Sequence, residues 1–217
     1  MITVYAFYNF PPAVKGIVRD LRVSWALEEL GLAYKTHWLD FAKGEQRDPP
    51  NRLVNPFGKV PAIENGALHL FESAAIVLYL YENAGKAPQD AHARAELNQW
   101  CFAALNTVEP VFQEVARWNA FWKDRPGREW RYPELLGLAA ERLDDLQRAL
   151  GARPYLLGHD FGPADILMTT VLNFTQHEPA IFAKHPGIRA YLERCRGRAA
   201  YGRALARQGE GPAADAA

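Results

Sequence analysis

Cysteine is scarce in this sequence, and the two cysteines that are present lie far apart. Cys101 and Cys195 are the only ones among 217 residues, and neither belongs to a Cys-x-x-Cys pair. We therefore expect no disulfide scaffold, and we expect a reducing compartment such as the cytoplasm. The six histidines show no spacing typical of metal ligands, so we predict no metal site.

Net charge and long apolar runs are missing as well. Lys and Arg together number 25 and so do Asp and Glu, which gives a formal net charge of zero. A neutral chain produces no field that draws it to nucleic acid or to an anionic membrane surface, so we expect neither partner. No apolar run approaches the length of a membrane span. The opening MITVYAF lacks the basic region followed by a long apolar core that marks a signal peptide, and we expect none.

The sequence does contain enough apolar residues for a substantial core. Apolar residues make up 49% of the chain and charged residues 23%, which is typical of a globular protein of one large domain or two small ones. A change in pattern near residues 83–90 (NAGKAPQD) predicts a linker between two domains. No internal repeat is visible.

The first part of the chain predicts a β-α-β unit. Ile2–Phe7 is apolar enough for a strand buried on both faces, and the following loop contains Pro11-Pro12, which prevents regular pairing. A helix begins at about Val18 and ends at Gly31, because its apolar residues recur at helical spacing. Leu32–Leu39 is the second predicted strand. A polar loop with one short helix follows, over residues 40–54.

The stretch NPFGKVPAIENGALHLFES predicts a turn, two strands and the start of a helix. Asn55-Pro56-Phe57-Gly58 is a turn signal, and residues 59–64 and 67–71 are the strands. Asn65-Gly66 predicts the tight hairpin turn between them, since both of its positions need a positive φ. Helical spacing resumes at Glu72-Ser73.

Two features of this stretch have chemical meaning. Pro61 removes a donor from its strand, and Ser73 offers a hydroxyl where the N–H groups of a new helix are unpaired. Taken alone, they are an edge strand and a serine cap. Taken in order, NPFG, VP, NG, the apolar strand and FES closely resemble glutathione transferases. In that family a thioredoxin-like domain carries a Val-Pro before a hairpin and a Glu-Ser at the next helix.

The second half of the chain predicts helices only. Apolar residues from Leu97 to Trp122 recur at three- and four-residue steps, with a kink expected at Glu109-Pro110. Gly162 stands where the family has a Ser or Thr cap, and Asp165 can still reach back to the Gly162 N–H. The other predicted helices span residues 135–150, 163–175, 188–195 and 201–206.

The resemblance implies a fold of two domains, α/β followed by all-α. We expect a thioredoxin-like βαβ-ββα domain over residues 1–82, the linker over 83–90 and a helical-bundle domain over 91–208. The final segment, 209–217, has no apolar pattern and is predicted to be disordered.

The resemblance also implies a glutathione site on the first domain. The main chain of Val60 pairs with the cysteinyl unit, which requires a cis bond to Pro61. Ser73 and its helix N-terminus take the γ-glutamyl carboxylate, while Glu72 lies near the ammonium group.

Cations and an amide are expected at the other end of the tripeptide. Gln46 or Arg47, together with Lys59, occupy positions where related sequences meet the glycyl carboxylate. For Arg47 and Lys59 the alternative is a solvated surface charge.

The group that activates the thiol is not evident. Ile17, Val18 and Arg19 align with the position where relatives have Ser or Cys. Lowering a thiol pKa by two units requires about 2.7 kcal/mol of preferential thiolate stabilisation. Three groups could contribute: Arg19 with the backbone N–H groups of Val18 to Asp20, the phenol of Tyr8, or the amide of Asn9. We favour Arg19. The alternatives are an ion pair of Arg19 with Asp20 or Glu72, and a surface role for Tyr8.

These expectations predict a cytosolic glutathione transferase that joins the glutathione thiolate to hydrophobic electrophiles. The electrophile pocket is assigned to Tyr8, Phe10, Trp118, Phe121 and Trp122, with core packing as the alternative for the Trp-rich segment. No cysteine stands at the strand–helix junction, which disfavours mixed-disulfide chemistry. The alternative functions are a non-catalytic glutathione-binding module and a glutathione-dependent isomerase or peroxidase. The family implies a homodimer.

Overall fold

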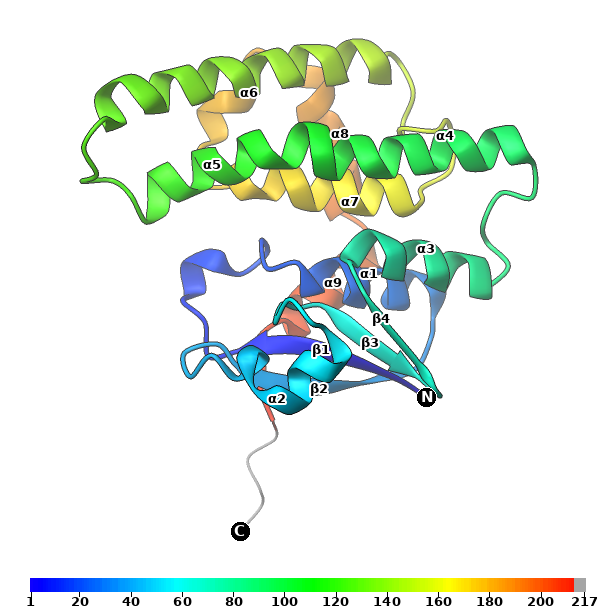
Figure 1. Cartoon of the computed structure of the whole chain (residues 1–217). Coiled ribbons are helices and arrows are strands. Elements are labelled where there is room, and N and C mark those ends of the chain that lie inside the picture. The colour runs from blue at the N-terminus through cyan, green and yellow to red at the C-terminus, as the bar shows by residue number, and fades with distance from the viewer. Residues whose placement is uncertain (213–217) are drawn as a thin grey trace. The chain divides into compact units, whose positions relative to one another are not determined.

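The computed structural model describes residues 1–212, and its contacts divide the chain into two compact units. The first unit contains Met1–Ala87 and the chain from Arg198 onward, and the second is Pro88–Gly197 (Figure 1). No helix within residues 1–212 is both long and apolar enough to cross a membrane.

The first unit is built on a mixed four-stranded sheet. Its strands are β1 (Ile2–Tyr8), β2 (Tyr34–Asp40), β3 (Ala62–Asn65) and β4 (Leu68–Phe71), in the order β2-β1-β3-β4. β1 runs parallel to β2 and antiparallel to β3, and β3 pairs antiparallel with β4. This topology confirms the predicted βαβ-ββα arrangement.

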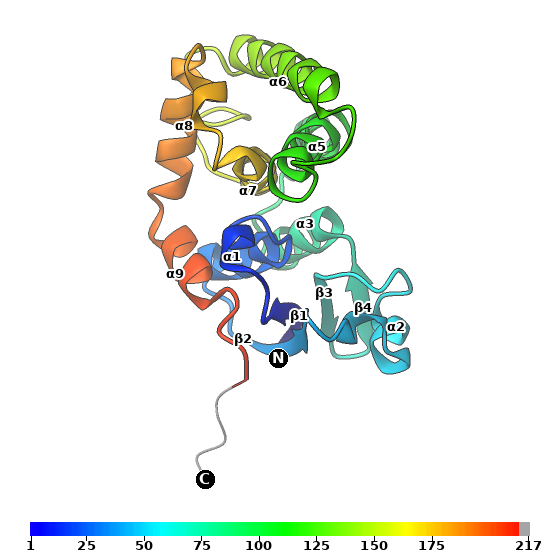
Figure 2. The same cartoon turned by 90° about the vertical axis from the view of Figure 1, so that its left-hand side faces the viewer.

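Three helices lie together on one side of this sheet: α1 (Asp20–Leu30), α3 (Ser73–Asn83) and α9 (Ala199–Arg207) (Figures 1 and 2). The short α2 (Pro49–Val54) lies beside β3 and β4 (Figure 2). α1 ends at Gly31 with a positive φ of 64°, as predicted. It presents an apolar face that is fully buried, comprising Leu21, Val23, Trp25, Ala26 and Leu27.

The hairpin turn lies one residue later than predicted. Asn65 is the last residue of β3 and pairs with Leu68, so the two turn residues are Gly66 and Ala67. Only Gly66 has a positive φ there, at 63°. The Asn65 side chain donates instead to the Tyr79 hydroxyl on α3, at 2.8 Å. That contact holds Asn65 in the strand, and the prediction of an Asn65-Gly66 turn was wrong.

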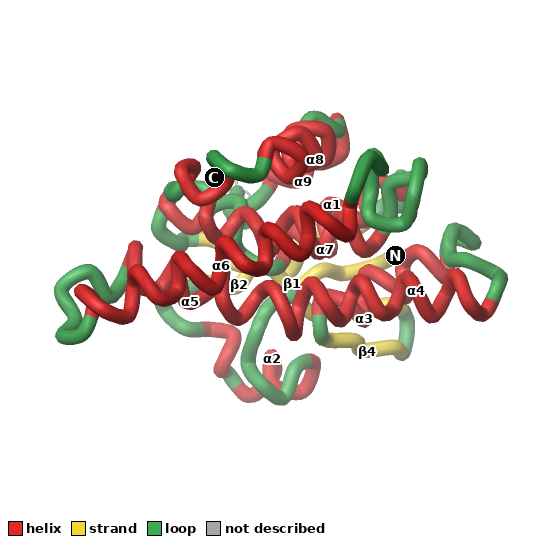
Figure 3. The backbone as a smooth tube through the Cα atoms, turned by 90° about the horizontal axis from the view of Figure 1, so that it is seen from above, coloured by secondary structure: helices red, strands yellow, loops and turns green. Residues whose placement is uncertain are grey.

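The second unit is entirely helical. Its helices are α4 (Ala91–Phe102), α5 (Glu109–Ala120), α6 (Arg128–Leu150), α7 (Pro163–Leu172) and α8 (Pro186–Arg196). Every residue of α7 is buried, and α7 packs against α4, α5 and α8 (Figure 3 shows the helices from above). The α7 cap forms as predicted, since the Gly162 N–H donates to Asp165 Oδ2 at 3.0 Å.

α4 and α5 are joined by a π-helical turn, Ala103–Val108, rather than by a kink at Glu109-Pro110. Pro110 has no N–H to offer the carbonyl of Asn106, and its ring would crowd that oxygen in an α-helix. A wider turn before the proline accommodates both effects, which is the usual setting of a π-bulge.

α9 belongs with the first unit, whereas the sequence analysis placed residues up to 208 in the helical domain. The Trp25 ring meets the Tyr201 ring edge to face at 4.8 Å, and Arg198 forms an ion pair with Glu29 at 2.7 Å. Of the segment predicted to be disordered, Gly209 pairs with Tyr8 as an isolated parallel bridge. Residues 213–217 lie outside the described part of the chain.

Candidate functional site

Three segments of the first unit converge at the end of β1: the loop that follows β1, the loop before β3 and the start of α3. Val60 belongs to a buried apolar cluster with Phe7 and Leu39, and Phe10 and Val18 pack against this cluster. The side chain of Val60 is thus held among residues from the first loop. The structure therefore brings Phe10, predicted for the electrophile pocket, to the same cluster as Val60.

The Val60–Pro61 peptide bond is cis, which confirms the prediction. β3 begins at Ala62, so Val60 stands outside the ladder with β1. Within residues 1–212 no hydrogen bond occupies its N–H or C=O. Asn55 holds the backbone just before Val60, because its Nδ2 donates to the Lys59 carbonyl at 2.8 Å. A valine with its side chain buried and its main-chain groups unused can pair with an extended peptide.

The start of α3 carries an unusual backbone. Glu72, the N-cap residue, has φ 69° and ψ 113°, although it is not a glycine. Such a conformation costs on the order of 1–3 kcal/mol, and residues that bear this cost cluster at functional sites. Glu72 is exposed and the adjacent Ser73 is only 5% exposed. The turn therefore places a carboxylate and a buried hydroxyl side by side at a helix N-terminus.

Arg22 meets Ser73 from α1 and was not identified from the sequence. Its side chain is 1% exposed, and its Nη1 donates to Ser73 Oγ at 3.0 Å. The hydroxyl thereby accepts a charged hydrogen bond and keeps its own proton available for an anion. The signal for Arg22 was its position within the apolar face of α1, since a buried arginine needs a partner.

The predicted glycyl-end residues surround the loop before Val60. Gln46 is 8% exposed, and its Oε1 has no hydrogen-bond partner within residues 1–212. The main-chain carbonyl oxygen of Gln46 lies 3.1 Å from the position that a Cβ on Gly58 would occupy. A side chain at Gly58 would be tight against that oxygen, and its φ of 58° also favours glycine. Arg47 and Lys59 are exposed, which fits both a ligand role and a solvated charge.

Among the candidates for thiol activation, Asn9 is already engaged. Its Nδ2 donates to both carboxylate oxygens of Asp40, at 3.0 and 3.2 Å, and its φ of 56° fits this turn. Burial, followed by the charges of Asp40 and Glu45, raises the pKa of Tyr8. Tyr8 therefore remains a neutral phenol, and the nearby carboxylates disfavour a second negative charge beside it.

The N-terminus of α1 retains some open N–H groups. Those of Leu21 and Arg22 donate to the carbonyls of Val18 and Arg19, each at 3.2 Å. Those of Val18 and Asp20 have no hydrogen bond within residues 1–212. Arg19 precedes Asp20 as the N-cap residue and is half-buried. Backbone N–H groups and a guanidinium at one helix start can stabilise an anion.

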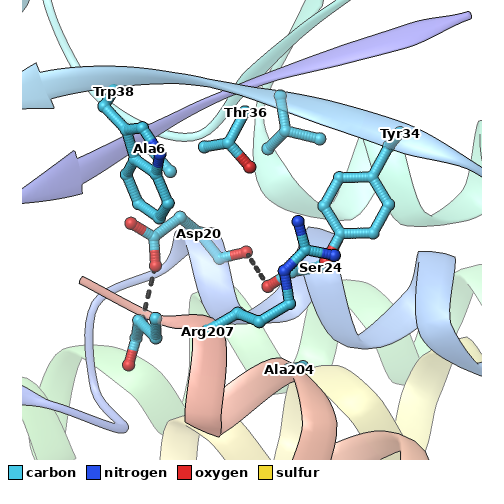
Figure 4. Close-up of a pocket in the computed structure, with 10 residues that line it drawn as sticks. Ala6, Asp20, Ser24, Tyr34, Thr36, Trp38, Ala204 and Arg207 are labelled. Atoms are coloured by element: carbon cyan, nitrogen blue, oxygen red, sulfur yellow. Dashed lines mark hydrogen bonds between the residues drawn. The ribbon is translucent and has the colours of Figure 1, made fainter. Parts of the chain in front are cut away.

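Asp20 is a second buried charged residue that the sequence analysis did not single out. Its Oδ2 accepts from the Phe7 N–H at 3.0 Å and its Oδ1 accepts from Gln208 Nε2 at 2.6 Å. Burial raises the pKa of Asp20 to about 6 against these hydrogen bonds. Figure 4 shows Asp20 with Ser24 and Trp38 around a cavity of about 20 Å³. That space holds about one water molecule and is too small for a tripeptide.

The two cysteines are buried in the helical unit. Burial raises the pKa of the Cys101 thiol and of the Cys195 thiol to about 12. Neither is a thiolate near neutral pH, so neither offers a nucleophile. Within residues 1–212 no cluster of three or more His, Cys, Asp or Glu side chains is arranged to hold a metal ion.

The aromatic residues assigned to the electrophile pocket lie at the end of α5, in the second unit. Trp118 is 8% exposed and meets the Trp122 ring edge to face at 5.5 Å, whereas Phe121 is 65% exposed. The Arg125 guanidinium stacks over Trp122 at 4.5 Å from the ring centre. Trp118 thus contributes to packing, while Phe121 and Arg125 form an exposed aromatic and cationic edge.

Comparisons with known proteins agree with this geometry. The family model for the glutathione S-transferase N-terminal domain matches residues 21–83. The disulfide-bond oxidoreductase YfcG of Escherichia coli (strain K12) is 30% identical over 194 residues, which are 85% of this chain and 88% of that protein. Glutathione S-transferase F14 of Arabidopsis thaliana is 27% identical, over 82% of this chain and 75% of the F14 chain.

A solved structure is similar over nearly the whole chain. It is a glutathione transferase family member from Pseudomonas fluorescens Pf-5, with two glutathione molecules bound. Its TM-score is 0.85 at 27% identity, and the match covers 94% of this chain and 92% of that one. The likeness therefore extends through both units.

Proposed function

The chain belongs to the glutathione S-transferase family, and we propose that it binds glutathione in the first unit and transfers the thiolate to hydrophobic electrophiles. The observation that carries the proposal is the cis Val60–Pro61 bond, with the open main chain of Val60, in the same unit as the Ser73–Arg22 pair. Together these features offer one partner for an extended peptide and another for a carboxylate.

The γ-glutamyl end is assigned to the start of α3. Ser73 would donate its hydroxyl proton to the carboxylate, because Arg22 already fills one of its acceptor positions. The buried guanidinium and the helix N-terminus both favour negative charge at this point. Glu72 is exposed at the same turn and would accept from the ammonium group.

The cysteinyl and glycyl units would lie along the loop before β3. Val60 would pair through its N–H and C=O with the cysteinyl unit, as one residue of an added strand. The open Oε1 of Gln46 would accept from an N–H of the glycyl unit, and the exposed Arg47 and Lys59 supply positive charge for the glycyl carboxylate.

The thiol would then reach the start of α1, where we assign its stabilisation to Arg19 with the open N–H groups of Val18 and Asp20. A thiol with an ordinary pKa is only slightly ionised at neutral pH, and two units of lowering need about 2.7 kcal/mol. The bonds of Asn9 to Asp40 make it a weaker candidate for this role than Arg19. In the first unit the electrophile is assigned to Tyr8 and Phe10. The role of the aromatic residues at the end of α5 stays a prediction, and the proposed setting is a cytoplasmic homodimer.

A second candidate function is glutathione-dependent reduction of disulfides. It is favoured by the 30% identical relative named a disulfide-bond oxidoreductase and by the structural neighbour that holds two glutathione molecules. A first glutathione thiolate would attack a substrate disulfide and expel one substrate thiolate. A second glutathione thiolate would attack the glutathione sulfur of the mixed disulfide. It would release the other substrate thiolate and leave glutathione disulfide, so no protein cysteine is needed.

The test measures glutathione binding by calorimetry, alongside turnover of an aryl halide and of hydroxyethyl disulfide. We expect Ser73→Ala to weaken glutathione binding by about tenfold or more, because it removes a hydroxyl that bonds a charged group. Ser24→Ala is the matched control, since within residues 1–212 the Ser24 hydroxyl bonds only to the Asp20 and Leu21 carbonyls of α1.

The outcomes separate the functions. Turnover of the aryl halide supports conjugation, and turnover of the disulfide alone supports reduction. Binding without either turnover leaves a glutathione-binding module. Equal affinity of the Ser73 and Ser24 variants would contradict the assigned site.

A further inference from the structure

The amide of Gln208 is fully engaged by residues near the opposite end of the chain. Its Oε1 accepts from the Gly16 N–H at 2.7 Å. Its Nε2 donates to the Val18 carbonyl at 3.1 Å and to Asp20 Oδ1 at 2.6 Å. The three partners fix the amide orientation, since one must donate and two must accept. Gln208 is 6% exposed, so this is a buried clamp on the loop that leads into α1.

The next residues continue along the same loop. Gly209 pairs with Tyr8, and a Cβ on Gly209 would lie 2.7 Å from Phe10 Cζ. A Cβ on Gly211 would lie 3.0 Å from Tyr8 Cδ2, and both glycines have positive φ values, 83° and 79°. The backbone of Gln208–Gly211, which we call the C-terminal strap, therefore rests directly on the Tyr8 ring at the end of β1 and on the Phe10 ring of the loop. A side chain at either glycine would displace the ring beneath it and strain a backbone of positive φ.

The clamped loop has little regular structure of its own. Between β1 and α1 it contains one short 3₁₀ turn, Pro12–Val14, and bonds such as Ile17 N–H to the Val14 carbonyl at 3.1 Å. Loops held by so few internal bonds open locally at low cost. The strap supplies long-range hydrogen bonds to Gly16 and Val18, on either side of Ile17 and just before Arg19.

We propose that Gln208 is a positioning residue for the thiol side of the site, and that the C-terminal strap holds the Tyr8–Arg19 loop in its working geometry. The inference rests on the proposed function, because that function places the thiol at the start of α1. Gln208 acts through the carbonyl of Val18 and the carboxylate of Asp20. These contacts hold the chain on both sides of Arg19, and with it the backbone that carries the open Val18 and Asp20 N–H groups. Stabilisation of an anion by such groups depends on their being fixed in advance.

The γ-glutamyl side is supported by a different contact. The three hydrogen bonds of the Gln208 amide go to residues 16–20, whereas the Ser73 hydroxyl is held from α1 by Arg22. Loss of Gln208 should consequently affect the ionisation of the bound thiol more than the affinity for glutathione. This asymmetry distinguishes positioning from a general loss of stability.

The experiment compares Gln208→Ala with Arg203→Ala. Arg203 also anchors the α9 region to α1, but its hydrogen bonds go to Glu28, at 2.7 Å for the carboxylate, and not to the loop. In Gln208→Ala we expect faster hydrogen exchange at the amides of residues 16–20. We also expect the pKa of bound glutathione, titrated by ultraviolet absorbance, to rise by about one unit, a tenfold change in thiolate fraction. The KM for glutathione should change much less than kcat, and Arg203→Ala should leave both the exchange and the pKa as in the wild type.

Two results would overturn the inference: unchanged exchange in the loop, or a loosened loop with an unchanged thiol pKa and kcat. The exchange measurement needs no ligand, so failure of the wild type to bind glutathione would refute the proposed function while the clamp is still tested. Gly209→Ala is a second variant that keeps Gln208 and displaces Phe10 instead. It should produce the same rise in thiol pKa, and a normal pKa in this variant would contradict the role of the strap.

Discussion

The two ends of the proposed site are built in opposite ways. The γ-glutamyl end comes from a contiguous stretch, Asn55–Ser73, completed by Arg22. The thiol end comes from a loop near the start of the chain that is clamped by Gln208, 192 residues after its partner Gly16. The first end carries its geometry in local sequence, through a cis proline and a positive-φ cap. The second depends on a distant segment, so its geometry is open to change by residues far from the chemistry.

The largest expected effect in this comparison comes from Arg22, the one distant residue of the first end. Arg22→Ala should lower the free energy of unfolding by about 3 kcal/mol, because it removes a buried charge from its partners and leaves a cavity. Glutathione binding should weaken together with stability, unlike in the Gln208 variant. Urea unfolding and calorimetry measure both quantities. A fully stable variant that binds glutathione normally would show that Ser73 needs no support from α1.

Asp20 allows the second end to be tested through pH. Its pKa is raised by burial from an ordinary value of 3.8 to about 6 in the folded protein. The folded state therefore holds an extra proton between these values. The stability contributed by this protonation is present below pH 3.8 and is lost as pH rises through 6. The difference amounts to about 3 kcal/mol at 1.36 kcal/mol per pKa unit.

Asp20→Asn should remove that pH dependence, because a neutral amide has no charge to desolvate, and at pH 7 it gains the free energy that burial of the carboxylate costs. Its nitrogen must face a donor, either the Phe7 N–H or the Gln208 amide, and the loss of that contact offsets about 1–2 kcal/mol of the gain. Unfolding curves of both proteins between pH 4 and 8 give the comparison. Parallel stability profiles in the two proteins would mean that Asp20 does not titrate in this range.

The smallest effect is expected at Glu72, where the first end bears backbone strain. Glu72→Gly should change stability by less than about 1 kcal/mol, and in the favourable direction, because glycine adopts its φ of 69° without a steric cost. Glutathione binding should nevertheless weaken through loss of the carboxylate. Glu82→Gly, within α3, is the control and should destabilise by about 1 kcal/mol. A Glu72 variant with lower stability than the control would argue that this turn is not strained.

The sequence was sufficient for the first end and insufficient for the second, for a physical reason. Val60, Pro61, Glu72 and Ser73 are close together along the chain, so a short stretch specified their arrangement, including the cis bond. The hairpin turn was predicted one residue early because the prediction used turn propensity alone. The contact of Asn65 with Tyr79 outweighed it.

Arg22, Asp20 and Gln208 were missed because their meaning lies in partners far along the chain. A charged residue on an apolar helix face was visible in the sequence, but its partner was not. The assignment of residues 198–208 to the first unit was missed for the same reason. Helical spacing identifies a helix but does not say which unit the helix packs against. Trp25 packs against Tyr201, and no local pattern connects them.

The discontinuous first unit has a consequence for protein synthesis. Residues 1–87 leave the ribosome long before α9, yet the Trp25 ring packs against Tyr201 and the α1 loop is clamped by Gln208. The nascent first unit must therefore wait, with part of its surface uncovered, while the whole helical unit is translated. The loop at the start of α1 can therefore be clamped only after Gln208 has been synthesised, so the thiol side of the site is completed late in folding.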